Sequence, residues 1–390
     1  MLIKNARVLN GQTGRFEDVP LHVQDGKIAA FADVDDADVF DGAGLYVIPG
    51  FIDTHIHGYV GVEFAKKGGG FTVAQEVLAA EGTTGFAATV RCMELQDMTA
   101  AAENIAAQMK LPQTGAKILG IHAEGPFVSH QRCGAMIPPD VECSVDNAAS
   151  LIDAGDGQLK IMTLAPEREN ALDVIAYADK RGVACSMGHT DATFQEACRG
   201  VDAGAVRATH VFNAMRPLSH RETGILGVAL TDERVTGEMI ADFIHLDPAA
   251  VKLILRAKGI ENVTLISDAG AQSGLPDGDY VVGGRVRHVR DGLCLNDDGR
   301  IAGSCFSMLC GAKNLLSLGV SLEDIALMAS VNPAKALGIF EQTGSIAVGK
   351  CADLIVCDEA LNIKAVFVDG VLQKTRDAVA SLHGDDIDVL

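Results

Sequence analysis

Residues Pro49-Gly50-Phe51-Ile52-Asp53-Thr54-His55-Ile56-His57-Gly58 form the stretch on which the fold and the chemistry of this chain depend. The apolar residues that follow the Pro-Gly pair predict a buried strand. Alternate side chains of a strand share one face, so His55 and His57 point the same way at its end. Two neutral imidazoles side by side can bind a divalent metal such as zinc. A His-x-His pair is common, however, so a metal site needs further ligands from elsewhere in the chain.

The composition is that of an ordinary globular protein and argues against several classes of function. The 390 residues are 48% hydrophobic and 22% charged, with a net charge of −20. A nucleic-acid binder would show a basic patch, and no apolar run is long enough to cross a membrane. The ten cysteines include no Cys-x-x-Cys pair, which is typical of reduced thiols. We therefore predict a cytoplasmic protein with no nucleic-acid or membrane partner, in which any phosphate pocket needs local positive groups.

Both ends of the chain show short strands. Residues 21–23 and 27–28 flank an Asp-Gly turn, which is a hairpin signal. Residues 349–358 and 365–371 show the same character near the other end. We predict that residues 1–48 and 345–390 join into one small β-sandwich domain, and that residues 382–390, which carry three aspartates, are held loosely.

Between these ends, apolar strands alternate with amphipathic helices. Strands are expected over residues 85–90, 118–122, 160–164, 184–187, 207–211, 238–241 and 263–267, and helices over residues 74–81, 99–109, 168–180, 194–200, 248–258 and 307–318. With the strand that ends at His55, this pattern makes about eight βα units, the signature of a TIM (β/α)8 barrel. We predict an α/β fold in which residues 49–344 form the barrel and carry the chemistry at the C-terminal ends of its strands.

Residues suited to metal binding follow five of the predicted strands: His55 and His57, Glu124, His189, His210 and Asp268. A catalytic zinc takes three protein ligands and leaves a position for water, and Glu124, His189 and His210 meet that count. His55 and His57 supply a second site that shares Glu124 or Asp268. We predict one or two divalent ions per subunit, most simply Zn²⁺, with Asp268 as the general base and acid. His122 stands two positions before Glu124. Its side chain either lies beside the metal ligands or is a structural histidine whose hydrogen bonds are satisfied within the protein.

Several segments resemble the amidohydrolase superfamily, and within it the N-acetylglucosamine-6-phosphate deacetylases. The resemblance runs along nearly the whole chain and rests on the His-x-His stretch together with His122-Ala123-Glu124-Gly125-Pro126-Phe127, Gly188-His189-Thr190, Thr209-His210-Val211-Phe212-Asn213-Ala214-Met215 and Ser267-Asp268-Ala269. The His-x-Glu-Gly-Pro and Thr-His-x-x-Asn-Ala-Met segments are the ones particular to the deacetylases. The resemblance implies a homodimer, and it implies that Glu124 stands where many relatives have a carboxylated lysine bridging two metals.

The same resemblance implies substrate contacts. Asn213 and Ala214 resemble the pair that holds the sugar phosphate, and Arg221 resembles an arginine that reaches the phosphate from the partner subunit. A guanidinium suits that task because its fork matches phosphate oxygens. A loop arginine paired with Glu222 is the other interpretation of Arg221.

Further residues of the resemblance concern the sugar and the amide. His245 resembles a catalytic histidine that contacts the substrate and polarises the amide carbonyl. Substrate contacts are also implied for Ala135 and Met136 and for the loop of Ile301, Ala302 and Gly303. The relatives usually have a histidine at the position of Met136, and a methionine cannot donate a hydrogen bond to a sugar hydroxyl.

The sequence therefore predicts a metal-dependent hydrolase that removes the acetyl group from N-acetylglucosamine 6-phosphate. Because of Met136, a deacetylase for an isomer such as N-acetylgalactosamine 6-phosphate stays open. Another amidohydrolase chemistry, such as an N-acyl-D-amino acid deacylase or a cyclic-amide hydrolase, is a further alternative, although its substrates carry no phosphate for Arg221. A non-enzymatic relative would be marked by lost ligands, and none is lost here.

Overall fold

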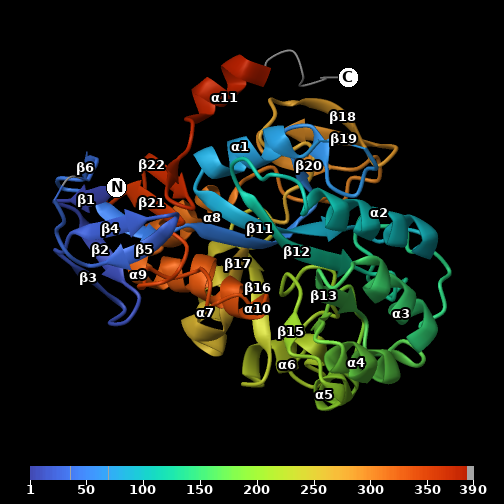
Figure 1. Ribbon diagram of the computed structural model, residues 1–390. Helices are drawn as coiled ribbons and strands as arrows, with labels where there is room; N and C mark the ends of the chain where they lie inside the picture. The colour runs from blue at the N-terminus through green and yellow to red at the C-terminus, as the bar shows by residue number, and fades with distance from the viewer. Residues whose placement is uncertain (36, 69, 384–390) are drawn as a thin grey trace.

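The structure is a computed structural model that describes residues 1–35, 37–68 and 70–383. Its centre is a barrel of parallel strands in the sheet order β17-β16-β15-β14-β13-β12-β11-β8 (Figure 1). The strands are β8 (Phe51–Ile56), β11 (Thr83–Val90), β12 (Lys117–Glu124), β13 (Leu159–Leu164), β14 (Ala184–Met187), β15 (Arg207–Ala208), β16 (Thr236–Ile240) and β17 (Val263–Ile266). A parallel bridge between Ile56 and Ala269 brings the chain after β17 beside β8, so the barrel nearly closes. The predicted TIM barrel is confirmed.

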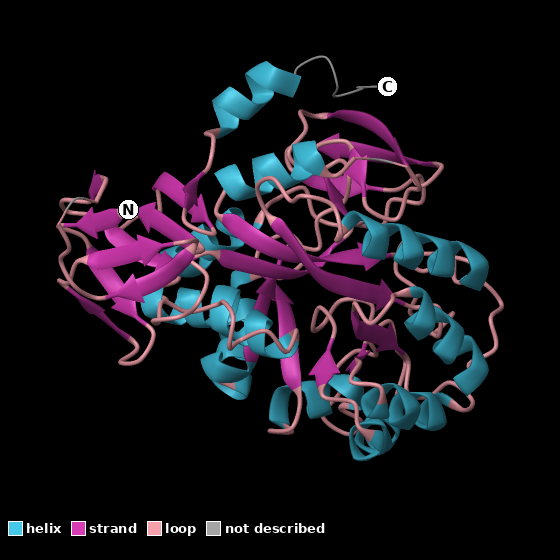
Figure 2. Cartoon of the chain, in the orientation of Figure 1, coloured by secondary structure: helices cyan, strands magenta, loops and turns pink. Residues whose placement is uncertain are grey.

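Helices alternate with these strands and surround the barrel (Figure 2). They are α1 (Thr72–Ala80), α2 (Leu95–Gln108), α3 (Val145–Ala154), α4 (Ala171–Lys180), α5 (Phe194–Ala203), α6 (Gly224–Thr231), α7 (Pro248–Lys258), α8 (Met308–Ser317), α9 (Leu322–Ala326) and α10 (Asn332–Ala336), with a π-helical turn at Leu327–Val331. Helix α5 begins with a reciprocal capping box between Thr193 and Glu196, and α7 begins at Pro248 after the N-cap Asp247. Helices α3, α6, α9 and α10 were not predicted.

Strand β15 is shorter than the prediction. It ends at Ala208, whereas a strand was expected to continue to Val211. The backbone turns away at His210, which has a φ of +29°, and again at Phe212, with a φ of +80°. A strand cannot continue through left-handed residues.

Strands from both ends of the chain form two sheets beside the barrel (Figure 1). A four-stranded sheet contains β1 (Leu2–Lys4), β4 (Leu21–Gln24), β5 (Lys27–Ala30) and β6 (Val39–Asp41), and a six-stranded sheet contains β2 (Arg7–Asn10), β3 (Arg15–Glu17), β7 (Tyr46–Pro49), β21 (Leu354–Cys357), β22 (Ile363–Val368) and β23 (Val371–Leu372). Their shared apolar core includes Ile3, Leu21, Val47, Leu354 and Phe367. The last described element is α11 (Arg376–His383), and the predicted loose tail lies outside the described residues from 384 onward.

An antiparallel sheet that was not predicted is inserted between β17 and α8. It contains β18 (Gly278–Val282), β19 (Arg285–Arg290) and β20 (Leu293–Leu295). Its two turns are Gly283-Gly284 and Asp291-Gly292, and all four residues have positive φ. These dipeptides are the tight-hairpin signal that would have identified the insertion in the sequence.

No helix in the described ranges combines the length and the apolar character that a membrane span requires.

Candidate metal centre

The six predicted metal ligands meet at the C-terminal mouth of the barrel, with Glu124 in the middle. Glu124 Oε1 lies 3.0 Å from His189 Nε2, 3.2 Å from His210 Nε2 and 3.3 Å from His55 Nε2. The other carboxylate oxygen, Oε2, lies 3.3 Å from His57 Nε2. The Glu124 carboxylate therefore stands between two histidine pairs and can face a cation on each side.

The spacing of the first group fits a metal ion. The Nε2 atoms of His189 and His210 lie 3.1 Å apart, and both face Glu124 Oε1. In a tetrahedral zinc site with ligands at about 2.0 Å, neighbouring ligand atoms lie about 3.3 Å apart. Two imidazole nitrogens and a carboxylate oxygen at this spacing are suited to hold one divalent cation.

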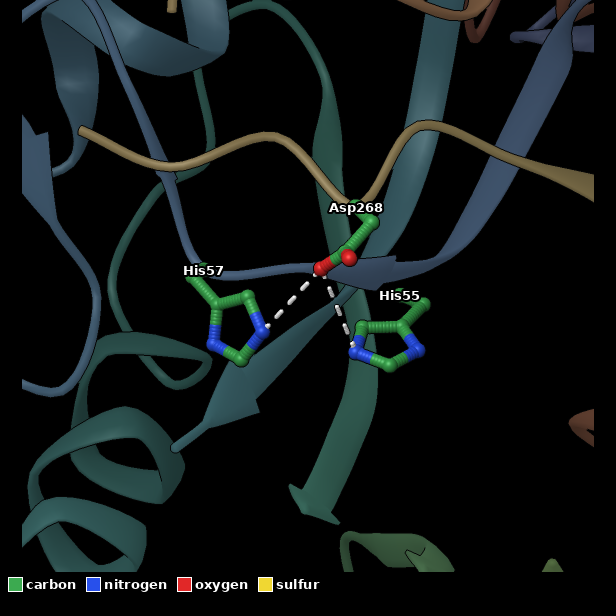
Figure 3. A group of neighbouring side chains, drawn as sticks. All are labelled: His55, His57 and Asp268. Carbon is green, nitrogen blue, oxygen red and sulfur yellow. Dashed lines mark ion pairs between the residues drawn. The ribbon is translucent and has the colours of Figure 1, made fainter. Parts of the chain in front are cut away.

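The second group consists of His55, His57 and Asp268 (Figure 3). Asp268 Oδ1 lies 3.6 Å from His55 Nε2 and 3.3 Å from His57 Nε2. The buried Nε2 of His55 has no hydrogen-bond partner in the described part of the chain. A buried polar atom without a partner is unfavourable, and a cation between these groups would satisfy it.

Unusual backbone conformations aim three of these side chains into the mouth. His189, His210 and Asp268 each come just after a barrel strand, and their φ angles are +46°, +29° and +50°. Left-handed backbone is uncommon outside glycine and costs conformational energy, and it gathers at functional sites. The surrounding barrel keeps these turns in place.

Charge within the centre keeps its carboxylates ionised. Burial alone would raise the pKa of Glu124, but His55 and His189 outweigh it and hold this pKa well below the usual range. Burial likewise opposes ionisation of Asp268, and the same kind of contact with His55 and His57 lowers its pKa to about 2. Both residues are therefore anions at neutral pH, as metal ligands must be.

Glu238 supports the centre from behind and was not predicted. Its carboxylate accepts hydrogen bonds from His55 Nδ1 at 3.1 Å and from Arg207 Nη2 at 3.0 Å, and it is fully buried. Orienting the far nitrogen of a ligating histidine in this way fixes which nitrogen faces the metal. No strand-end position marked this residue in the sequence, because it lies within β16.

We expect Glu238→Gln to lower the free energy of unfolding by about 3 kcal/mol, because it leaves the buried Arg207 without its counter-charge. Urea titration followed by circular dichroism measures the change. The exposed Glu233→Gln is the matched control, and equal stability of the two variants would contradict the assignment.

His122 lies beside the candidate ligands and is also held by hydrogen bonds, so both descriptions apply: its ring centroid lies 4.5 Å from that of His55. Its Nδ1 lies 3.1 Å from the Thr54 carbonyl oxygen, and its Nε2 lies 2.8 Å from Thr163 Oγ1. Burial, aided by the nearby His55, lowers the pKa of His122 to about 3. A neutral imidazole with both nitrogens engaged by hydrogen bonds has no atom left for a metal.

A cavity of about 670 Å³ opens over the metal centre. With one exception, the predicted substrate contacts line it: Ala135, Met136, Asn213, Ala214, His245, Ile301, Ala302 and Gly303. Asp242 Oδ2 lies 2.7 Å from His245 Nδ1 and so fixes the ring. Burial would lower the pKa of His245, but the contact with Asp242 outweighs it and raises this pKa.

Arg221 is the exception. It is exposed and does not line the cavity of its own chain. The described residues include no ion pair between Arg221 and Glu222, whose carboxylate instead accepts hydrogen bonds from the backbone N–H groups of Phe194 and Gly224. The cavity wall instead carries Arg91, Arg285, Arg287 and Arg300, which were not predicted.

Comparison with known proteins identifies the family. The model of the "Amidohydrolase family" matches residues 46–372. The N-acetylglucosamine-6-phosphate deacetylase of Bacillus subtilis (strain 168) is 37% identical over 93% of this chain and 93% of its own length. An N-acetylgalactosamine-6-phosphate deacetylase from Escherichia coli O157:H7 is 33% identical over 95% of this chain and 98% of its own. Among solved structures, this chain is similar to an aspartate-to-alanine mutant of the N-acetyl-D-glucosamine-6-phosphate deacetylase of Mycobacterium smegmatis, solved in complex with N-acetyl-D-glucosamine-6-phosphate. The two structures superpose with a TM-score of 0.85 at 33% sequence identity, and the match covers 96% of this chain and 99% of that chain. The chain belongs to the amidohydrolase family.

Proposed function

We propose that this protein is a metal-dependent deacetylase that converts N-acetylglucosamine 6-phosphate to glucosamine 6-phosphate and acetate. The observation that carries the proposal is the meeting of Glu124, His189 and His210 around one point, beside Asp268, at the floor of a 670 Å³ cavity. The relatives named above match nearly the whole length of this chain, and their names support the same reaction.

The metal residues would hold one or two divalent ions, most simply Zn²⁺. Glu124, His189 and His210 form one site, and His55 and His57 form the other with Asp268 or Glu124. A divalent ion bound there would supply an activated water at neutral pH and would polarise the amide carbonyl.

The remaining steps belong to two side chains at the cavity floor. Asp268 takes a proton from the attacking water and passes it to the nitrogen as the C–N bond breaks. His245, held by Asp242, donates a hydrogen bond to the carbonyl oxygen as negative charge develops there. The Asn213 amide and the backbone at Ala214 hold the sugar phosphate, and Met136 and the Ile301–Gly303 loop line the pocket for the sugar.

Turnover of sugars with and without the phosphate tests the substrate. We expect kcat/KM for N-acetylglucosamine 6-phosphate to exceed that for N-acetylglucosamine by about a hundredfold, since charged contacts to a phosphate are strong. N-acetylgalactosamine 6-phosphate belongs in the same assay, because Met136 and the Escherichia coli relative favour it as the second candidate. Equal turnover of the phosphorylated and unphosphorylated sugars would mean that the phosphate is not recognised. That result would favour the alternatives whose substrates carry no phosphate, N-acyl-D-amino acids or cyclic amides.

We also propose a homodimer in the cytoplasm, in which Arg221 of one subunit reaches the phosphate in the cavity of the other. The exposed position of Arg221 and its absence from its own cavity support this arrangement. All ten cysteines are free, which suits a reducing compartment.

Arg221→Met is expected to lower kcat/KM for the phosphorylated sugar by about tenfold without changing turnover of the unphosphorylated one. Arg256→Met, at an exposed position on α7, is the control. Mixed dimers of Arg221→Met and Asp268→Asn subunits show which subunit supplies the arginine. If Arg221 acts across the interface, the site of the Arg221→Met subunit has its own Asp268 and receives an intact Arg221 from the other subunit. Regained activity after mixing supports the shared site, and no gain over the separate variants contradicts it.

A further inference from the structure

The wall of the cavity carries a cluster of arginines for which the proposed reaction has no role. Arg285 and Arg287 lie on β19, Arg91 follows β11, and all three line the cavity above the metal centre. We call these three residues the arginine cluster. Figure 1 shows the sheet of β18, β19 and β20 on the same side of the barrel as α1 and α2.

The arginine cluster has more positive charge than its surroundings neutralise. Arg91 Nε pairs with Glu63 Oε1 at 2.9 Å. In the described ranges, no carboxylate oxygen lies within 4.0 Å of Arg285 or Arg287, whose guanidinium groups bond only to the backbone carbonyls of Ala135 and Val286. Glu94 and Asp97 line the same cavity but form no ion pair with the cluster among the residues that the structure describes, so its three cations have one paired carboxylate, Glu63.

The three guanidinium groups lie close enough to act on one another. Burial lowers the pKa of Arg287, and the nearby charges of Arg285 and Arg91 lower it further. The Arg91 side chain is also packed against Gly283, where an added Cβ would lie 2.6 Å from Arg91 Nη2. Like charges held together in a half-buried cavity are stabilised by an anion, and guanidinium groups bind carboxylate and phosphate oxygens well.

Within the cluster, Arg91 follows a strand that lies across the barrel from the residues assigned to the phosphate. In the sheet order, β11 and β15 are separated by β12, β13 and β14, and β15 precedes Asn213. Strands that far apart in an eight-stranded barrel stand on opposite sides of it. Arg285, in contrast, donates to the Ala135 carbonyl oxygen at 3.4 Å, and the preceding Gly134 lies next to Ala214 and His189, so the cluster extends over the metal centre toward that side.

We propose that Arg91, Arg285 and Arg287 form an oxyanion-binding subsite within the same chain as the metal ligands, for a phosphate or carboxylate group of the ligand. The inference rests on the proposed function for the amino-sugar identity of that ligand. The oxyanion has two possible sources: the 6-phosphate itself, in place of the Asn213 and Ala214 contacts proposed above, or a second acidic group on the acyl chain or the sugar.

Anion binding without turnover is the first test. Inorganic phosphate and succinate are titrated into the metal-loaded protein, and their dissociation constants are measured by calorimetry. Arg287→Met and Arg285→Met are each expected to weaken binding of at least one anion by about tenfold. Arg290→Met is the control, because Arg290 lies on the same strand but is exposed and paired with Asp279. Melting temperatures establish that the variants fold.

Turnover distinguishes the two sources. If the 6-phosphate occupies the subsite, Arg287→Met lowers kcat/KM for N-acetylglucosamine 6-phosphate and not for N-acetylglucosamine. If a second acidic group occupies it, wild-type protein prefers a 3-O-carboxyalkyl derivative of the phosphorylated sugar, and Arg287→Met removes that preference. Anion affinities and sugar preferences that stay the same in both variants overturn the subsite. Should no sugar be turned over, the proposed function fails, while the anion titration still decides the subsite.

Discussion

Asp268→Asn is expected to lower kcat for deacetylation by about a thousandfold, the size of effect that a positioned proton-transfer group has. An asparagine amide cannot take the proton from water or return it to the leaving nitrogen. The ion held by Glu124, His189 and His210 is expected to stay bound, because that group does not include this residue, whereas an ion held with His55 and His57 would lose its Asp268 ligand.

The design separates proton transfer from metal loss. Metal is measured by elemental analysis on the same protein sample as turnover, and Asp298→Asn, at an exposed aspartate in the turn after β20, is the matched control. Near-wild-type turnover of Asp268→Asn would remove Asp268 from this role. Loss of metal together with turnover would instead assign Asp268 chiefly as a ligand.

Glu124→Gln is expected to remove both bound metal and turnover. Its carboxylate is the one group that faces all four histidines of the centre, and each of its contacts is 3.0–3.3 Å long. A neutral amide is a weak ligand for zinc and leaves the facing imidazoles without a counter-charge. The variant should contain little metal after purification, and added zinc should restore little activity.

Chelation provides the matched comparison for this variant. Wild-type protein treated with a chelator is expected to lose its activity and to regain it when zinc is added, whereas Glu124→Gln should not respond. Wild-type turnover that persists after complete metal removal would falsify the metal mechanism. Retained metal in the variant would show that Glu124 is not essential for binding.

The barrel could be predicted because its pattern is local. Each strand is a short apolar run, and each helix that follows has its own apolar face, so hydrophobic periodicity places most of them within a few residues. The exceptions have local causes as well. Strand β15 is shorter than predicted, because the left-handed backbone at His210 and Phe212 cannot be recognised from the residue pattern. The division into residues 1–48 with 345–390 and residues 49–344 stays a prediction.

The candidate ligands could be predicted because barrel strands end at one rim. Residues such as His189 and Asp268 stand directly after apolar runs, and a parallel barrel gathers all such positions. Glu238 and the arginine cluster could not be found in this way. Glu238 lies inside a strand, and Arg285 and Arg287 lie on a hairpin whose distance from the rim depends on how the insertion folds back.

By itself, the order of residues in this chain predicted a barrel and a set of candidate strand-end ligands, since periodicity and strand-end position are properties of short segments, and its resemblance to amidohydrolases predicted the chemistry. Only the tertiary structure decided that Glu124 stands between two histidine pairs and that both ring nitrogens of His122 are engaged by hydrogen bonds. It also decided that arginines other than Arg221 line the cavity of the chain itself. Those outcomes depend on side chains far apart in sequence meeting at distances of 3–4 Å, and no local pattern encodes such distances.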